Sequence, residues 1–337
     1  MQTSQLPTIA ITLGDPAGIG AELIAKLIHR IQYDNNAHII VIGDPWLWDE
    51  GQRLAKTSIT LPHVKSFLEA KQHAGIFFLA FNSIESNQVV KAQVNAECGR
   101  SVLDILSFCL DAALNHEIDA ICFAPLNKNA MKLGGLQFDD ELHFFADYLN
   151  IDSYICEFNT LGSIWTSRIS SHIPLKDVNK FVTVERIDAA TKLMYHSLQA
   201  VGIDSPRIAV AAFNPHGGDG GLCGTEEIDT IIPAVKSLNE QGYPIAGPFP
   251  ADTIFLKVRD GLYDAVVTMY HDQGQIAIKL LGFEKGVTVQ GGLPIPITTP
   301  AHGTAFDIAT QGTANVEATY QAFLIAKKMA HSVIQKS

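Results

Sequence analysis

The sequence has no run of lysine or arginine and no apolar segment long enough to cross a membrane. Its 24 basic residues are outnumbered by 35 acidic ones, and the formal net charge at pH 7 is -11. A chain with this charge lacks the attraction to phosphate that underlies binding to a nucleic-acid backbone. We therefore expect neither a nucleic acid nor a membrane as a partner.

Signal-peptide and disulfide patterns are also missing. The N-terminal segment MQTSQLPTIAITLGDP has no basic region, and its apolar stretch is too short for a signal peptide. The cysteines form no CxxC pair, and most lie in apolar runs: Cys98, Cys109, Cys122, Cys156 and Cys223. This pattern predicts reduced core thiols in a cytoplasmic protein.

What the sequence does have is a regular alternation of two apolar patterns. Short apolar runs typical of buried strands end in turn residues at 8–16, 38–45, 118–125, 207–215 and 263–272. Segments with helical spacing lie between them, and from Val102 to Ala113 the apolar residues share one helix face. The alternation predicts an α/β fold, and 337 residues are enough for two lobes with a cleft between them.

Polar and glycine-rich residues follow the predicted strands, at the edge where open α/β sheets bind ligands. In segment 213–221, FNPHGGDGG, the backbone can approach an anion or cofactor closely, so we consider Gly217, Gly218 and Gly220 as cofactor contacts. An ordinary loop is the alternative. The opening GDPAGIG does not match the GxGxxG fingerprint and predicts a tight strand-to-helix turn rather than a Rossmann domain.

Two further kinds of side chain are candidates for chemistry. His172, His216 and His271 stand in polar, turn-like settings, and three neutral imidazoles suit a divalent catalytic ion such as zinc. Their spacing matches no short metal motif, so spacing alone favours structural histidines. Lys128 and Lys279 follow strand-end motifs and can hold a carboxylate or phosphate, or accept a proton if desolvated. Solvated surface lysines are the alternative.

Segment 302–309, HGTAFDIA, places a glycine and a threonine before an expected helical run. Backbone amides at the start of a helix favour negative charge, so this segment is a candidate anion site or an ordinary N-cap.

Several motifs together resemble the 4-hydroxythreonine-4-phosphate dehydrogenase family of vitamin B6 biosynthesis. They are, in order, GDPAGIGAE, SSHIPLKD, NPHGGDGGLCGTEEIDTIIPA, GPFPADTIF, MYHDQGQIAIKLLGF and HGTAFDIA. The resemblance implies the two-lobed α/β/α fold of isocitrate and isopropylmalate dehydrogenases, with the active site in the interdomain cleft. On this basis we expect one lobe from residues 1–130 and 300–337, and a second from 131–299 with the dimer interface.

The resemblance also implies roles for individual residues. His172, His216 and His271 match the metal ligands of a homodimer whose metal site is shared across subunits, with His271 coming from the partner chain. Zinc is the expected ion, with magnesium, manganese or cobalt as alternatives. Asp252 and Asp272 match active-site acids, and Lys279 matches a substrate-binding lysine. The segment HGTAFDIATQGTAN resembles a loop that holds NAD or NADP, through His302, Gly303, Thr304, Ala305 and Asn315.

The sequence departs from the family in the substrate pocket. Glu141 and Leu142 stand where the family has a histidine and a threonine, while His143, Lys128, Lys279, Thr288 and Ile297 complete the expected substrate-binding set. Thr288 replaces an asparagine, and Ile297 replaces an arginine that would give phosphate charge-assisted hydrogen bonds of about 1.5–3 kcal/mol each. The acidic run from Asp139 adds repulsion unless Lys128 or Lys132 compensates.

We therefore expect a metal-dependent NAD(P)-linked dehydrogenase that oxidises a secondary alcohol of a small hydroxy acid. The metal would lower the pKa of the alcohol, Lys279 or Asp272 would accept the proton, and the β-keto acid formed would lose carbon dioxide. Alternatives are a paralogue acting on an unphosphorylated substrate such as a cis-dihydrodiol carboxylate, a phosphotransacetylase-like acyltransferase, and a non-catalytic nucleotide- or metabolite-binding protein.

Overall fold

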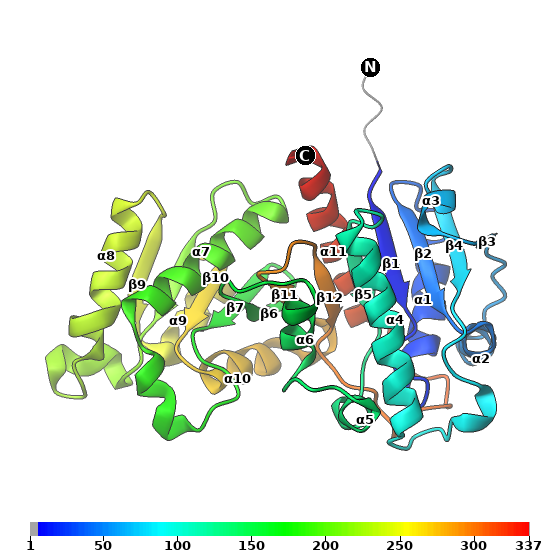
Figure 1. The fold of residues 1–337 in the computed structure, drawn as a ribbon. Helices are drawn as coiled ribbons and strands as arrows, with labels where there is room; N and C mark the ends of the chain where they lie inside the picture. Colours follow the sequence, from blue (N-terminus) through cyan, green and yellow to red (C-terminus); the bar gives the residue numbers. More distant parts are fainter. Residues whose placement is uncertain (1–5, 337) are drawn as a thin grey trace. The chain divides into compact units, whose positions relative to one another are not determined.

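The computed structural model describes residues 6–336, which fold into two compact α/β units (Figure 1). The first unit contains Met1–Asp152 and Leu293–Ser337, and the second contains Ser153–Gly292. The chain therefore leaves the first unit once and returns to it, and residues 131–152 and 293–299 belong to the first unit. The predicted α/β class is confirmed.

The first unit is built on a parallel sheet with the strand order β3-β4-β2-β1-β5-β12. Its strands are β1 (Thr8–Thr12), β2 (His38–Gly43), β3 (His63–Val64), β4 (Gly75–Ala80), β5 (Ala120–Phe123) and β12 (Ile297–Pro300). Every residue of β1 and β2 is buried, as expected for parallel strands covered on both faces. This explains why their sequences are continuous apolar runs rather than alternating ones.

Helices surround this sheet, namely α1 (Gly20–Ile31), α2 (Pro45–Ala55), α3 (Phe67–Ala70), η1 (Ser86–Gln88), α4 (Ala96–Leu114), α5 (Lys128–Gly134), α6 (Glu141–Tyr148) and α11 (Glu317–Lys336). The predicted apolar face of α4 is confirmed, because Val102, Leu106 and Cys109 are buried in the core of this unit. Asn95 caps the helix by accepting a hydrogen bond from the Glu97 amide.

The second unit combines antiparallel and parallel strands in the order β11-β6-β7-β10-β8-β9. Its strands are β6 (Cys156–Leu161), β7 (Ile164–Arg168), β8 (Ile208–Ala211), β9 (Ile245–Phe249), β10 (Ala265–Thr268) and β11 (Gly286–Gly291). β6 is antiparallel to both β11 and β7, and β7, β10, β8 and β9 run parallel. The carboxyl ends of β7 and β10 therefore lie side by side.

The helical segments of the second unit are η2 (Leu175–Phe181), α7 (Val184–Ala200), η3 (Pro215–Gly221), η4 (Glu227–Ile231), α8 (Ile232–Glu240), α9 (Ala251–Arg259), α10 (His271–Gly282) and η5 (Phe283–Lys285). Helix α10 directly follows β10 and packs against β6, β7 and β10. Any residue in its first turn is therefore placed at the carboxyl edge of the sheet.

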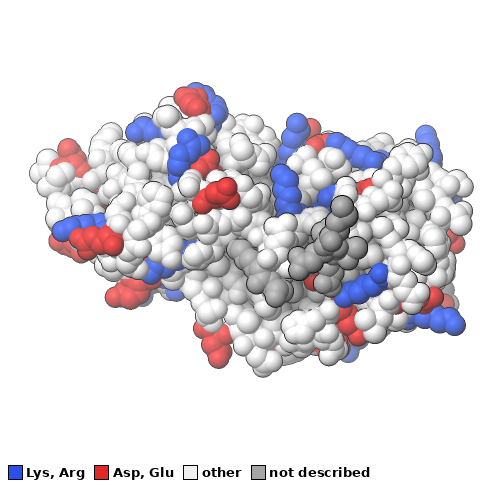
Figure 2. All heavy atoms as spheres, turned by 90° about the horizontal axis from the view of Figure 1, so that it is seen from above, with Lys and Arg blue, Asp and Glu red and all other residues white. Residues whose placement is uncertain are grey.

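The surface and the cysteines fit a reduced globular protein. Lysine and arginine side chains are scattered among acidic and uncharged residues on the face drawn in Figure 2. Among the helices of residues 6–336, none has the length and apolar character that a bilayer crossing requires. The cysteines are free, and four are buried as predicted, whereas Cys223 is exposed.

Candidate active site

A cavity of about 250 Å³ lies at the carboxyl edge of the second unit's sheet. It is lined by Ser170, Ser171, His172, Ile173, Leu175, Val178, Tyr270, His271 and Asp272. Its polar residues follow β7 and β10, whose last residues, Arg168 and Thr268, are paired in the sheet. The parallel pairing thus brings together two segments that are about a hundred residues apart in the sequence.

His172 and His271 lie next to each other, with ring centroids 5.9 Å apart. Because a zinc–nitrogen bond is about 2.0–2.1 Å long, two imidazoles on one tetrahedral ion have their ring centres roughly 5–6 Å apart. The Nδ1 atom of His271 is 2.7 Å from Oδ1 of Asp272. A carboxylate in this position holds the proton on Nδ1 and leaves Nε2 as the ligand atom. The donor set fits two ligands of a divalent metal ion.

His216 occupies a different part of the second unit. It is exposed in η3, and the five residues 216–220 all have positive φ, from 45° at Asp219 to 82° at Gly218. Within residues 6–336, no group of three histidine, cysteine, aspartate or glutamate side chains is arranged to hold a metal ion. One chain therefore brings His172 and His271 together, whereas we expected His271 to approach the site from the partner chain. His216 is the expected ligand that lies apart from this pair, and sharing of the site between subunits stays a prediction.

A buried glutamate holds the start of the loop that carries His216. Glu227 is 1% exposed, and its Oε1 accepts hydrogen bonds from the amides of Phe213 at 2.8 Å and Asn214 at 2.7 Å. A Cβ at Gly218 would lie 2.7 Å from Glu227 Oε2, so a glycine is required there. We did not predict this role from the sequence. Glu226 and Asp229 lie beside Glu227 in GTEEIDTII, so the sequence offered no signal that separates it from its acidic neighbours.

The glycine-rich loop is closed by hydrogen bonds of its own backbone. The Gly217 amide donates to Asn214 O at 3.1 Å, and the Cys223 amide donates to Gly218 O at 3.0 Å. Gly218 is buried, whereas Gly220 is exposed. The Gly217 amide is thus already used within the loop, which leaves cofactor contact by this loop a prediction.

The other expected residues of the second unit are spread over three elements. Asp252 is exposed in the first turn of α9, and Lys279 is exposed on α10, two turns after His271. Thr288 lies on β11, and its Oγ1 accepts a hydrogen bond from Asn159 Nδ2 at 3.3 Å. Of the two expected acids, Asp252 and Asp272, Asp272 is the one that contacts the histidine pair.

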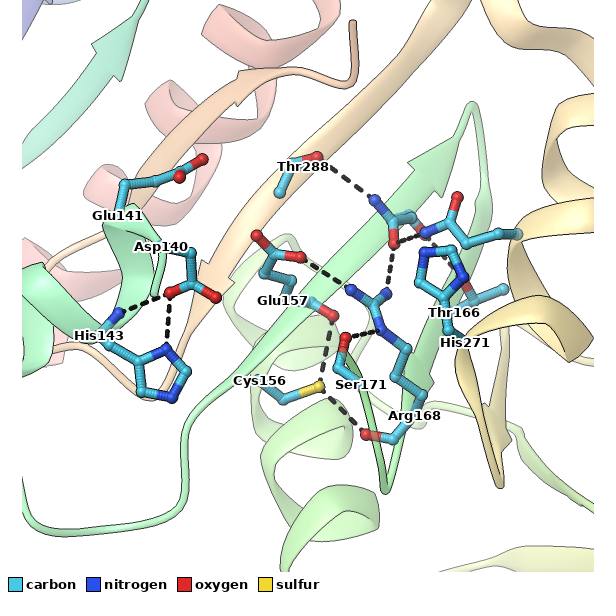
Figure 3. Close-up of polar contacts among 12 residues, drawn as sticks. Asp140, Glu141, His143, Cys156, Glu157, Thr166, Arg168, Ser171, His271 and Thr288 are labelled. Atoms are coloured by element: carbon cyan, nitrogen blue, oxygen red, sulfur yellow. Dashed lines mark hydrogen bonds and ion pairs between the residues drawn. The ribbon is translucent and has the colours of Figure 1, made fainter. Parts of the chain in front are cut away.

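In the first unit, acidic and basic side chains of the expected substrate region form pairs. Lys128 Nζ is 3.5 Å from Glu141 Oε2, and Lys132 Nζ is 4.0 Å from Asp139 Oδ1. Asp140 caps α6 and accepts hydrogen bonds from the backbone amide and, at 2.6 Å, from the ring of His143 (Figure 3). The lysines that we considered as compensating cations therefore neutralise local carboxylates.

Two expected substrate residues lie inside the first unit's core. Leu142 is 3% exposed, and Ile297 on β12 is fully buried among apolar side chains of the sheet. Apolar side chains at these positions gain more from burial than from exposure to a polar ligand. The Ile297 side chain that we expected at the substrate position therefore packs in the core.

Segment 302–315 folds against the turn between β1 and α1. Thr304 O accepts a hydrogen bond from the Ile19 amide at 3.2 Å, and a Cβ at Gly18 would lie 2.8 Å from Thr304 Cβ. Burial lowers the pKa of His302, which favours the neutral ring. Asn315 accepts a hydrogen bond from the Glu317 amide at the start of α11. The GDPAGIG turn is thus the support of the segment expected to hold the cofactor.

The helix that we expected after Thr304 does not form. Residues 306–310 form turns, because Ala305 and Thr310 adopt positive φ values of 45° and 76°, outside the right-handed helical region. Residues 302–310 therefore present no helix N-terminus that would favour an anion.

Asp15, in the turn between β1 and α1, is a second acid whose environment we did not predict. It is 2% exposed, and its Oδ1 accepts a hydrogen bond from the Ala17 amide at 2.8 Å. Burial raises its pKa from 3.8 to about 6, against the smaller opposing effects of this hydrogen bond and of Lys91. Burial also raises the pKa of the neighbouring Cys98 thiol to about 12, which makes it unreactive.

Comparison with known proteins gives matches along nearly the whole chain. A protein-family model described as "Pyridoxal phosphate biosynthetic protein PdxA" matches residues 35–326. A Pseudomonas aeruginosa protein provisionally named 4-hydroxythreonine-4-phosphate dehydrogenase 2 is 47% identical over 98% of both chains. The D-threonate 4-phosphate dehydrogenase of Salmonella typhimurium is 35% identical, covering 96% of this chain and 99% of its own.

The fold is similar to that of a solved structure as well. The 4-hydroxythreonine-4-phosphate dehydrogenase of Klebsiella pneumoniae superimposes with a TM-score of 0.83 at 31% identity, covering 98% of this chain and 100% of its own.

Proposed function

The chain belongs to the PdxA family, whose named relatives are dehydrogenases, and we propose that it oxidises a secondary alcohol of a small phosphorylated hydroxy acid with NAD or NADP. Loss of carbon dioxide from the resulting β-keto acid would follow. The relatives named for 4-hydroxythreonine 4-phosphate and D-threonate 4-phosphate support this substrate class. The observation that carries the proposal is the His172–His271 pair with Asp272 at the carboxyl edge of the sheet.

His172 and His271 would hold a divalent metal ion, with His216 as the third ligand, and zinc is the ion that we propose. When bound, the metal would lower the pKa of the substrate hydroxyl and stabilise an enolate, and the nicotinamide would accept hydride. Segment 302–305 and Asn315 would hold the cofactor. Their support by the β1–α1 turn favours this assignment.

The exposed face of α10 supports a homodimer. Ile276 and Leu280 are 58% and 83% exposed on the same helix that begins with His271. Exposed apolar residues on one helix favour a protein interface, and a second copy packed on α10 would lie beside the histidine pair. A dimer would thus supply the third ligand that one chain does not bring to this pair.

Proton transfer is assigned to Lys279, since Asp272 is engaged by His271. Lys279 is exposed, and a solvated ammonium is a poor proton acceptor. Packing of a second chain on α10 would remove water from this side chain, as a proton acceptor requires. Asp252, in the first turn of α9, would remain as a supporting acid of the site.

A second candidate is the oxidation of an unphosphorylated substrate, such as a cis-dihydrodiol carboxylate. The Lys128–Glu141 pair favours it, because the carboxylate reduces the positive charge that Lys128 can offer to a phosphate.

A substrate panel tests both candidates. The full chain would be assayed for NADH and NADPH formation with 4-phosphohydroxy-L-threonine, D-threonate 4-phosphate, unphosphorylated hydroxy acids and dihydrodiols, each with added zinc, magnesium, manganese or cobalt. Efficient turnover of a phosphorylated compound supports the first candidate, and turnover of unphosphorylated compounds alone supports the second. If the protein binds NAD but forms no NADH with any compound of the panel and any of the four metals, both candidates are overturned. His172→Ala is the matched inactive control.

A further inference from the structure

A buried ionic network connects the two segments that carry the histidine pair. Arg168, at the end of β7, has a side chain that is 5% exposed and pairs with Glu157 Oε2 at 2.8 Å. Its Nη1 donates to Asn159 Oδ1 at 2.7 Å, and its Nε donates to Ser171 Oγ at 2.9 Å. Figure 3 shows the guanidinium between Glu157 and Ser171. One side chain therefore joins β6, β7 and the loop that follows β7.

The network extends from Asn159 to helix α10. Gln275 Nε2 donates to the same Asn159 Oδ1 that accepts from Arg168, while Asn159 Nδ2 donates to Thr288 on β11. Gln275 lies one turn after His271 on α10, and Ser171 directly precedes His172. Arg168 is thus connected by hydrogen bonds to both segments that carry the histidine pair.

Two simpler roles for Arg168 do not fit these contacts. A phosphate or carboxylate site needs a guanidinium with accessible donors, whereas this one is buried, neutralised by Glu157 and directed to three protein acceptors. Net stability is also a weak reason for a buried ion pair, since well-packed apolar residues in its place are often neutral or stabilising. What a guanidinium offers here is a rigid planar fork that fixes several acceptors at once.

We propose that Arg168 is a positioning residue that sets the spacing between His172 and His271. It acts on His172 through Ser171 and on His271 through Asn159 and Gln275. The inference rests on the proposed function, because the spacing of the two rings matters if both bind one metal ion.

Binding of Co²⁺ alone to the full chain tests the inference without any assay of turnover. The dissociation constant and the visible absorption spectrum of bound Co²⁺ would be measured for the unchanged protein, Arg168→Met and Arg168→Lys. Groups behind metal ligands typically change metal affinity about 10–100-fold, so we expect Arg168→Met to weaken Co²⁺ binding by about this factor and to alter the spectrum. Arg168→Lys should fail to restore either, because one ammonium cannot span Ser171 and Asn159.

The matched control is Arg207→Met in the same unit. Arg207 forms a two-bond pair with Asp264, with distances of 3.1 and 2.7 Å, and it precedes β8, away from the carboxyl edge of the sheet. Loss of this pair removes the same kind of interaction, but we expect Co²⁺ affinity and spectrum to stay unchanged.

Two milder variants keep the test decisive if Arg168→Met fails to fold. Gln275→Leu cuts the connection to α10, and Ser171→Ala cuts the connection to the His172 loop, and neither leaves a buried charge unpaired. Each should weaken Co²⁺ binding several-fold. Wild-type affinity and spectrum in folded Arg168→Met, or in both milder variants, would overturn the inference and leave the proposed function standing. Absence of Co²⁺ uptake by the unchanged protein would overturn the proposed metal site and the inference with it.

Discussion

The ring of His271 and the carboxylate of Asp272 are joined by a hydrogen bond of 2.7 Å within the first turn of α10. Neighbours in the sequence thus act as one unit, in which the acid sets the tautomer of the ring that precedes it. In the proposed mechanism this acid holds the ring of His271, and Lys279 is the proton acceptor.

Asp272→Asn should lower Zn²⁺ affinity by about 10–100-fold while the protein stays folded. The amide can no longer hold the Nδ1 proton through a charged acceptor, so the ring becomes a weaker ligand. Competition with a chelator measures the affinity. Asp260→Asn, at the end of α9, is the matched control, and equal affinities of the two variants would contradict the prediction.

Glu227→Gln should lower the free energy of unfolding by about 1–3 kcal/mol, because one side-chain oxygen is replaced by an amide donor facing Asn214 Nδ2. Hydrogen exchange at the Phe213 and Asn214 amides would also become faster. Glu226→Gln is the control, since Glu226 is only half-buried and binds the Asn214 side chain without touching the backbone. Chemical denaturation measures the free energy of unfolding of both variants. A larger decrease for Glu226→Gln than for Glu227→Gln would contradict the role assigned to Glu227.

Gly303→Ala should leave thermal stability unchanged but weaken NAD or NADP binding several-fold. Among the described residues, nothing lies within 4 Å of a Cβ at Gly303, so a loss of affinity would report close approach of the cofactor. Gly18→Ala should lower both stability and affinity, because its Cβ would press against Thr304. Calorimetric titration of the two variants separates these outcomes, and unchanged affinity in Gly303→Ala would remove the segment from the cofactor site.

The stability of Asp15→Asn relative to the unchanged protein should depend on pH. Burial raises the pKa of Asp15 from 3.8 to about 6, so its folded form retains a proton that the unfolded form loses. The stabilisation is therefore present below pH 4 and is lost as pH rises through about 6, a change of about 3 kcal/mol at 1.36 kcal/mol per unit. Urea titrations from pH 4 to 8 measure it, and a constant difference would contradict the raised pKa.

Leu280→Asp should convert the proposed dimer to a monomer, because it places a charge on the exposed apolar face of α10. Light scattering coupled to size-exclusion chromatography measures the mass. Leu133→Asp on α5 is the matched control, since Leu133 is also exposed, at 65%, but lies in the first unit. A monomeric unchanged protein, or a dimeric Leu280→Asp, would contradict the proposed interface.

Sequence patterns predicted the elements better than the contacts between them. Continuous apolar runs correctly predicted buried strands such as β1 and β2, and helical spacing correctly predicted the buried face of α4. Patterns could not say which histidines meet, since His172 lies near His271 only because β7 pairs with β10. Strand order depends on long-range pairing that periodicity does not encode.

The roles of two charged residues, Arg168 and Glu227, could not be predicted from sequence patterns. Arg168 stands between Ser167 and Ile169, and Glu227 directly follows Glu226, so the local sequence does not mark either charge as buried. Sequence patterns also offer no means of identifying the hydrogen-bond partners of these two side chains. The expected helix after Thr304 is absent for a local reason. Ala305 and Thr310 adopt positive φ values, and the sequence does not show which residues do so.

The division of the first unit into two sequence segments affects how the protein is made. β12 pairs with β5, and Lys26 on α1 donates to the carbonyls of Gly312 and Ala314, so the final stretch of the chain completes a unit that was begun at the other end. During translation the second unit can therefore finish folding while the first still lacks its last strand and helix. The first sheet can therefore gain its last strand only after residues 297–300 have emerged from the ribosome.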